Sequence, residues 1–144
     1  MLGLSDKYKG FIFDMDGTIY LEDKMIEGAF ETLNYLIENK KHILFVTNKT
    51  TQTRSEYTEF LQSHDLNIST TDILTAADNS VNYLKKNRSE KKFYAIAEDS
   101  FINSIEKVGL VFTDNPDEIE IVIISLDRNY SRNKFEIAEK SLIY

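Results

Sequence analysis

Short apolar runs of strand length alternate with segments of helical period along the chain, and this alternation most constrains the fold. A strand, a helix and a second strand favour a parallel sheet, because parallel neighbours need a crossover and a helix usually provides it. The last predicted strand is rich in β-branched residues, which is typical of a buried strand. The predicted strands lie at 11–13, 43–46, 72–74, 93–97 and 119–126.

The segments between these strands carry apolar residues three and four positions apart, as amphipathic helices do. Thr53 and Glu56 have the spacing of a capping box, and Gly109 stands where a helix is expected to stop. Ser131 is predicted to cap a last helix that runs to Tyr144. We therefore expect an α/β fold with a parallel sheet. The predicted core-facing helix residues are Phe30, Leu33, Leu36, Ile37, Tyr57, Phe60, Leu61, Val81, Leu84, Phe101, Ile102, Ile105 and Val108.

Charge and composition restrict the partners that the chain can bind. The 144 residues include 24 acidic and 17 basic side chains, a net charge of −7, so the chain repels nucleic-acid phosphates unless it keeps a basic patch. Lys40–Lys41 and Lys91–Lys92 are only short pairs. No apolar run approaches the roughly 20 residues that span a bilayer, and residues 1–7 lack the apolar core of a secretory signal. Without cysteine, disulfides and thiolate metal sites are excluded. We expect a cytoplasmic protein with no nucleic-acid or membrane partner.

Two carboxylates, Asp14 and Asp16, follow the first predicted strand. Open α/β folds bind ligands at the carboxyl ends of parallel strands. Alternate residues of an extended segment share a side, so one carboxylate can attack a reacting group while the other transfers protons. Gly17 allows a sharp turn, and the amides around it are expected to point at an anion. A calcium loop would need a Glu at the twelfth position, where counting from Asp14 reaches Met25.

The segment Asp14–Thr18 resembles the first signature motif of haloacid dehalogenase-type phosphatases. Ile43–Asn48 is similar to the second motif, in which a Thr or Ser ends the next core strand. The polar run Lys49–Thr51 and the flap-like segment from Tyr20 to Ala29 look most like the NagD-type and p-nitrophenylphosphatase-like enzymes. Leu126–Tyr130 resembles part of the large C2-type cap of that subfamily.

This resemblance implies a role for each matching residue. Asp14 would be the nucleophile that forms an aspartyl-phosphate, and Asp16 would protonate the leaving oxygen and then deprotonate water. Thr47 would donate a hydrogen bond to the phosphoryl group, with Asn48 close by. Mg²⁺ would bind the Asp14 carboxylate and the Asp16 backbone carbonyl. The implied substrate is a small phosphorylated metabolite.

The resemblance also implies a division into two parts. Residues 1–76 would form the N-terminal part of a Rossmann-like catalytic core, and 77–144 part of an inserted α/β cap. The family's later lysine and acidic motifs lie after the cap, so we expect the chain by itself to be weakly active or inactive. We also expect unpaired edges and apolar faces to cause self-association or marginal stability.

Two alternatives stay open at the level of sequence. The chain can be read as a complete capless phosphatase that uses Lys107 as the lysine and Asp127 as the acidic metal ligand. Against this, Ser125–Arg128 has neither the Gly-Asp nor the Asp-Asp of the family's acidic motif, and Arg128 would stand beside the metal. The second alternative is a binding or regulatory module without catalysis, built on the same scaffold.

Overall fold

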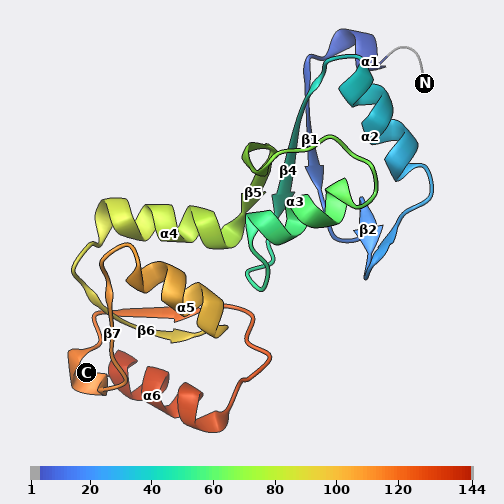
Figure 1. The fold of residues 1–144 in the computed structure, drawn as a ribbon. Helices are drawn as coiled ribbons and strands as arrows, with labels where there is room; N and C mark the ends of the chain where they lie inside the picture. Colours follow the sequence, from blue (N-terminus) through green and yellow to red (C-terminus); the bar gives the residue numbers. More distant parts are fainter. Residues whose placement is uncertain (1–3, 144) are drawn as a thin grey trace. The chain divides into compact units, whose positions relative to one another are not determined.

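The computed structural model describes residues 4–143, and their contacts divide the chain into two compact units (Figure 1). Among the described residues, the first unit comprises 4–48 and 52–76, and the second comprises 49–51 and 77–143. Each unit has its own three-stranded sheet, and every strand pair in these two sheets is parallel. The predicted α/β fold with parallel sheets is therefore confirmed.

The sheet of the first unit has the strand order β1–β4–β5, and a small antiparallel hairpin, β2–β3, follows β1 along the chain. Helix α2 packs on β4, and α3 packs on β5. The bounds of these elements are α1 Leu4–Lys7, β1 Gly10–Asp14, β2 Tyr20–Leu21, β3 Lys24–Met25, α2 Ala29–Glu38, β4 His42–Thr47, α3 Arg54–Gln62, a 3-10 turn at Thr70–Asp72, and β5 Ile73–Thr75.

The core of the first unit forms because both helices present the apolar stripe that their sequences predict. Leu33 and Leu36 of α2 are buried, as are Tyr57 and Leu61 of α3. Phe45, in the central strand β4, is fully buried. The capping box at the start of α3 is present as predicted: Thr53 caps the helix, and the side chain of Glu56 accepts a hydrogen bond from the Thr53 amide at 2.6 Å.

The second unit has the strand order β7–β6–β8. Alternate residues of β6 enter two different apolar clusters, Phe93 with residues of α5 and Tyr94 with Ala138 of α6, so the sheet is covered on both faces. The bounds here are α4 Ala76–Asn87, β6 Lys92–Ile96, α5 Asp99–Glu106, β7 Val111–Phe112, a 3-10 turn at Pro116–Glu118, β8 Ile121–Ile124, and α6 Arg132–Leu142.

Several predicted boundaries differ from the structure. The strand predicted at 119–126 is β8, which covers only Ile121–Ile124 and whose last residue is 70% exposed. Among residues 4–143, β8 pairs with β6 alone, and this pairing covers Ile121–Ile124. Helix α6 ends at Leu142, and Tyr144 lies outside the described residues. Across residues 4–143, none of the helices combines the length and apolar character needed to cross a bilayer.

Candidate active site

Asp14 is the last residue of β1, and its side chain is exposed. The next residue, Met15, is fully buried in the core, and Asp16 is half-buried. This alternation is what an extended segment produces, since successive side chains point to opposite sides. The Asp14 carboxylate accepts a hydrogen bond from the Thr18 hydroxyl at 3.5 Å.

The loop after Asp14 is a tight turn closed by its own backbone. Gly17 has φ +75°, a left-handed conformation that favours glycine. The Met15 carbonyl accepts hydrogen bonds from the amides of Thr18, Ile19 and Tyr20 at 3.2, 2.8 and 3.3 Å, and the Gly17 amide donates to the Tyr20 carbonyl at 2.8 Å. These four amides are engaged within the loop, so the expectation that they point at an anion is wrong for them.

The turn brings the side chain of Tyr20 back to Asp16. The Tyr20 hydroxyl donates a hydrogen bond to Asp16 Oδ2 at 3.1 Å, although the residue as a whole is only 4% exposed. Burial raises the pKa of Tyr20 far above its ordinary value, and the nearby Tyr57 and Asp16 raise it further. The hydroxyl therefore keeps its proton and remains a donor.

Thr47 and Asn48 lie at the same end of the sheet as the two carboxylates. Asp14 pairs with Val46 across the parallel β1–β4 register, so Thr47 stands one residue further toward the carboxyl end. Thr47 is buried and ends β4, whereas Asn48 is exposed and follows the strand directly. The structure thus brings all four predicted site residues to the carboxyl end of the first unit's sheet, where β1 and β4 both end.

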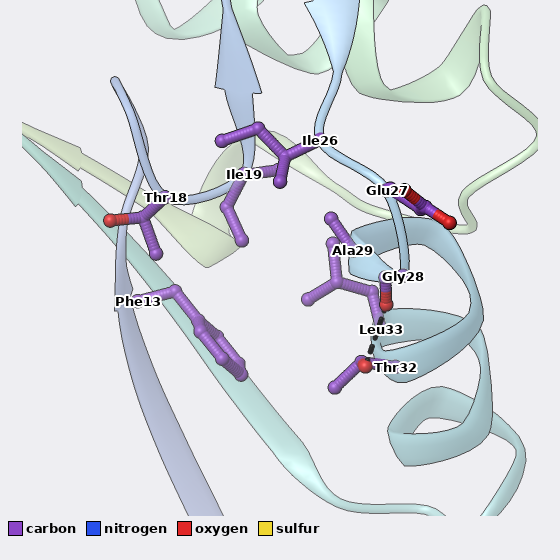
Figure 2. A pocket seen from close by; sticks show the side chains of 9 residues that line it. All are labelled: Phe13, Thr18, Ile19, Ile26, Glu27, Gly28, Ala29, Thr32 and Leu33. Atoms are coloured by element: carbon purple, nitrogen blue, oxygen red, sulfur yellow. Dashed lines mark hydrogen bonds between the residues drawn. The ribbon is translucent and has the colours of Figure 1, made fainter.

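A cavity of about 230 Å³ lies beside the loop (Figure 2). Phe13 and Thr18 line one side of it and the start of α2 the other, where the Thr32 hydroxyl donates to the Gly28 carbonyl at 2.7 Å. The four predicted site residues are not among the residues that line it. Its lining consists of Phe13, Thr18, Ile19, Ile26, Glu27, Gly28, Ala29, Thr32 and Leu33.

The residues of the capless alternative, Lys107 and Asp127, belong to the second unit. Lys107 is exposed at the end of α5. The Asp127 side chain is only 1% exposed, and it accepts hydrogen bonds from Lys134 Nζ at 2.6 Å and from the Asn129 amide at 2.8 Å. These hydrogen bonds join the Asp127 carboxylate to the loop between β8 and α6 and to α6 itself.

The sequence was compared with models of known protein families. The sequence model of the haloacid dehalogenase-like hydrolases matches residues 11–111, which include both signature segments of the first unit. The chain belongs to the haloacid dehalogenase-like hydrolases. The resemblance that Asp14–Thr18 and Ile43–Asn48 suggest is therefore confirmed.

Several proteins that are similar to this chain are named phosphatases. An acid sugar phosphatase from Staphylococcus haemolyticus (strain JCSC1435) is 30% identical over 131 residues, which are 91% of this chain and 49% of that protein. Phosphoglycolate phosphatase 1A, chloroplastic, from Arabidopsis thaliana is 34% identical over 117 residues, 80% of this chain and 32% of that protein. The structure of a p-nitrophenyl phosphatase from Archaeoglobus fulgidus superimposes with a TM-score of 0.83 at 26% identity, covering 94% of this chain and 52% of that chain. The chain thus spans about half the length, or less, of these relatives.

Two residues at this site were not predicted from sequence. Thr75 ends β5 and pairs with Thr47 across the register, and both threonines are buried. A threonine directly after the apolar pair Ile73–Leu74 was the available signal. Tyr20 gave no comparable signal, because its contact with Asp16 depends on the turn at Gly17.

Proposed function

We propose that the natural polypeptide carrying this chain is a phosphomonoester hydrolase that forms a covalent intermediate on Asp14. The observation that carries the proposal is the exposed Asp14 carboxylate at the carboxyl end of β1, with Asp16 and Thr47 at the same end of the sheet. Membership of the haloacid dehalogenase-like hydrolases supports this reading.

The proposed chemistry has two displacements at phosphorus. In the first, a carboxylate oxygen of Asp14 attacks phosphorus, the bond from phosphorus to the ester oxygen breaks, and the Asp16 carboxyl group gives its proton to the departing oxygen. In the second, the Asp16 carboxylate takes a proton from water while that water attacks the aspartyl-phosphate. Inorganic phosphate leaves, Asp14 is again a carboxylate, and Asp16 again carries its proton.

Thr47 and Asn48 are proposed to donate hydrogen bonds to the phosphoryl oxygens. Thr47 is buried at the end of β4, so packing sets its position before substrate binds. Donors fixed in this way stabilise the charge of a transition state without having to reorganise during the reaction.

Magnesium fits the oxygen donors of this segment. The exposed Asp14 carboxylate and the Asp16 backbone carbonyl would hold the ion, since Mg²⁺ commonly uses one or two protein carboxylates and completes its shell with water and substrate phosphate. Within residues 4–143 there is no cluster of three or more His, Cys, Asp and Glu side chains suited to a metal. When bound, the ion neutralises charge between the carboxylate and the phosphate.

We further propose that the first unit is part of the catalytic core and that the second unit is part of a C2-type cap. The substrate would be a small phosphorylated metabolite. Support for this class comes from relatives named acid sugar phosphatase and phosphoglycolate phosphatase. In capped family members the cap contributes contacts that select the substrate, so the second unit would help to set specificity.

Hydrolysis of p-nitrophenyl phosphate by the complete natural polypeptide, with and without Mg²⁺, tests the proposal. Asp14→Asn removes the nucleophile and is expected to lower kcat by at least about 10³-fold. Asp65→Asn is the matched control, because Asp65 is exposed and its positive φ of 60° suits asparagine as well. Hydrolysis that persists in Asp14→Asn, or that is unaffected by removing all divalent ions, would contradict the proposed mechanism.

A further inference from the structure

Tyr20 combines deep burial with a hydrogen bond to the carboxylate that is proposed to transfer protons. Its ring belongs to the core cluster of the first unit and meets the Phe60 ring edge-on, with ring centroids 4.9 Å apart. Its hydroxyl lies 3.1 Å from Asp16 Oδ2. The Tyr20 ring is therefore fixed by packing in the core, and its hydroxyl holds the Asp16 carboxylate at the site.

The backbone of the loop fixes the same pair of residues. Asp16 and Tyr20 form a parallel β-bridge, and the Gly17 amide donates to the Tyr20 carbonyl at 2.8 Å. The Tyr20 amide also donates to the Met15 carbonyl at 3.3 Å. The main chain and the side chain of Tyr20 are thus both hydrogen-bonded to the segment that carries Asp16. These bonds restrict the orientation of each residue relative to the other.

The Tyr20 hydroxyl is the donor of this hydrogen bond, and Asp16 Oδ2 accepts it at 3.1 Å. An Asp side chain has a broad, two-fold χ2 preference, and a fixed donor on one oxygen restricts that rotation. The orientation of the Asp16 carboxyl group is consequently set before substrate arrives.

We propose that Tyr20 is a positioning residue that holds the Asp16 carboxyl group in the orientation needed to protonate the leaving oxygen. This inference rests on the proposed function, in which Asp16 is the acid of the first step. A buried tyrosine that merely satisfies its hydroxyl on a nearby carboxylate would stabilise the fold and leave the proton transfer unaffected. The two roles predict different results when the hydroxyl is removed. If Tyr20 positions Asp16, the fall in kcat/KM grows as the leaving group needs protonation more; if Tyr20 only stabilises the fold, the fall is the same for every leaving group.

Tyr20→Phe in the complete natural polypeptide separates these roles, since the ring and its packing on Phe60 remain. The substrates form a series with an increasing need for protonation: 2,4-dinitrophenyl, p-nitrophenyl and phenyl phosphate, and then an alkyl phosphate. We expect kcat/KM to fall about 10- to 100-fold for the alkyl ester and to change little for the dinitrophenyl ester, within the range that general acid catalysis contributes. An equal loss across the series would overturn the proposal.

A double-mutant cycle with Asp16→Asn gives a second readout. Once Asp16 has lost its proton-transfer role, Tyr20→Phe should cause no further loss with the alkyl ester, so the two effects should not add. Additive effects would overturn the proposal. Thr58→Val is the control, because it removes another buried hydroxyl of the first unit, one that donates to the Arg54 carbonyl at 2.8 Å; its effect on kcat/KM should be the same for every ester.

Failure of the proposed function gives a different pattern. If the wild-type polypeptide hydrolyses none of these esters, or if Asp14→Asn leaves hydrolysis intact, both the function and the role of Tyr20 are rejected. If hydrolysis depends on Asp14 while Tyr20→Phe acts equally on every ester, only the role of Tyr20 is rejected. Thermal unfolding of each variant checks that a loss of rate does not come from a loss of fold.

Discussion

Gly17 is the residue on which the geometry of the loop after β1 depends. Its φ of +75° costs an L-residue roughly 1–2 kcal/mol, and a Cβ at this position would meet no atom within 4 Å. The penalty of Gly17→Ala is therefore conformational. We expect a loss of stability of about 1–2 kcal/mol in urea unfolding, together with a fall in phosphatase activity, because relieving the strain shifts the hydrogen bonds that bring Tyr20 to Asp16.

Gly109→Ala is the matched control for Gly17→Ala. Gly109 also has a positive φ, +102°, with open space where a Cβ would stand, but it lies in the second unit. A comparable loss of stability without a comparable loss of activity is expected. If both variants lost activity in proportion to stability, the special role of the Gly17 turn would be refuted.

For individual residues, the sequence predicted which side chains lie together at the site, but it did not predict the directions of the backbone amides. Asp14 and Thr47 end neighbouring parallel strands, and period and composition predict those strands directly. The direction of the amides after Gly17 depends on one set of torsion angles and on which amides reach the Met15 carbonyl, and neither can be predicted from the residue types. The contact of Tyr20 with Asp16 could not be predicted for the same reason.

At the scale of elements, the capping box of α3 is a local signal that the structure reproduces. The Thr53 hydroxyl accepts from the Glu56 amide at 3.3 Å, and Glu56 Oε2 accepts from the Thr53 hydroxyl at 2.8 Å. We expect Thr53→Ala to destabilise the chain by about 0.5–2 kcal/mol, measured by urea unfolding at neutral pH. Thr70→Ala, at an exposed threonine in a 3-10 turn, is the control and should cost less.

The capping box also makes this loss depend on pH. Hydrogen bonds from the Thr53 amide and hydroxyl lower the pKa of Glu56, so the folded state binds its proton less tightly than the unfolded state. A lowered pKa contributes stability above the ordinary value of 4.5, and this contribution disappears as the pH falls through the folded value. The difference between wild type and Thr53→Ala should therefore shrink below about pH 4. A difference that stays constant into acid would contradict the role of the Glu56 carboxylate.

The elements that sequence did not predict are short or lie at edges. β2, β3 and β7 have two residues each, too few for a period to emerge. In the run from Ile119 to Leu126, composition predicted a long buried strand, but side chains of β8 reach both clusters of the second unit from an edge position. β-branched composition therefore identified the strand, whereas its length was set by how far β6 extends beside it.

At the scale of the whole molecule, the second unit leaves apolar side chains in contact with solvent. Ile124 at the end of β8 and Leu142 at the end of α6 are each 70% exposed, and Leu126 and Phe135 are 55% and 46% exposed. Among residues 4–143, β8 pairs with β6 alone and is an edge strand of its sheet. Unpaired strand edges and exposed apolar groups both favour association with another chain.

We propose that this 144-residue chain, studied by itself, self-associates through the second unit. Light scattering coupled to size exclusion should give a mass above 16.7 kDa that rises with protein concentration. Ile124→Lys combined with Leu142→Lys should lower that mass, because a charge at either position must be desolvated in the contact. Leu21→Lys, at a residue of the first unit that is 67% exposed, is the matched control and should leave the association unchanged. A chain that stays at the monomer mass at every concentration would show that these apolar side chains do not hold chains together.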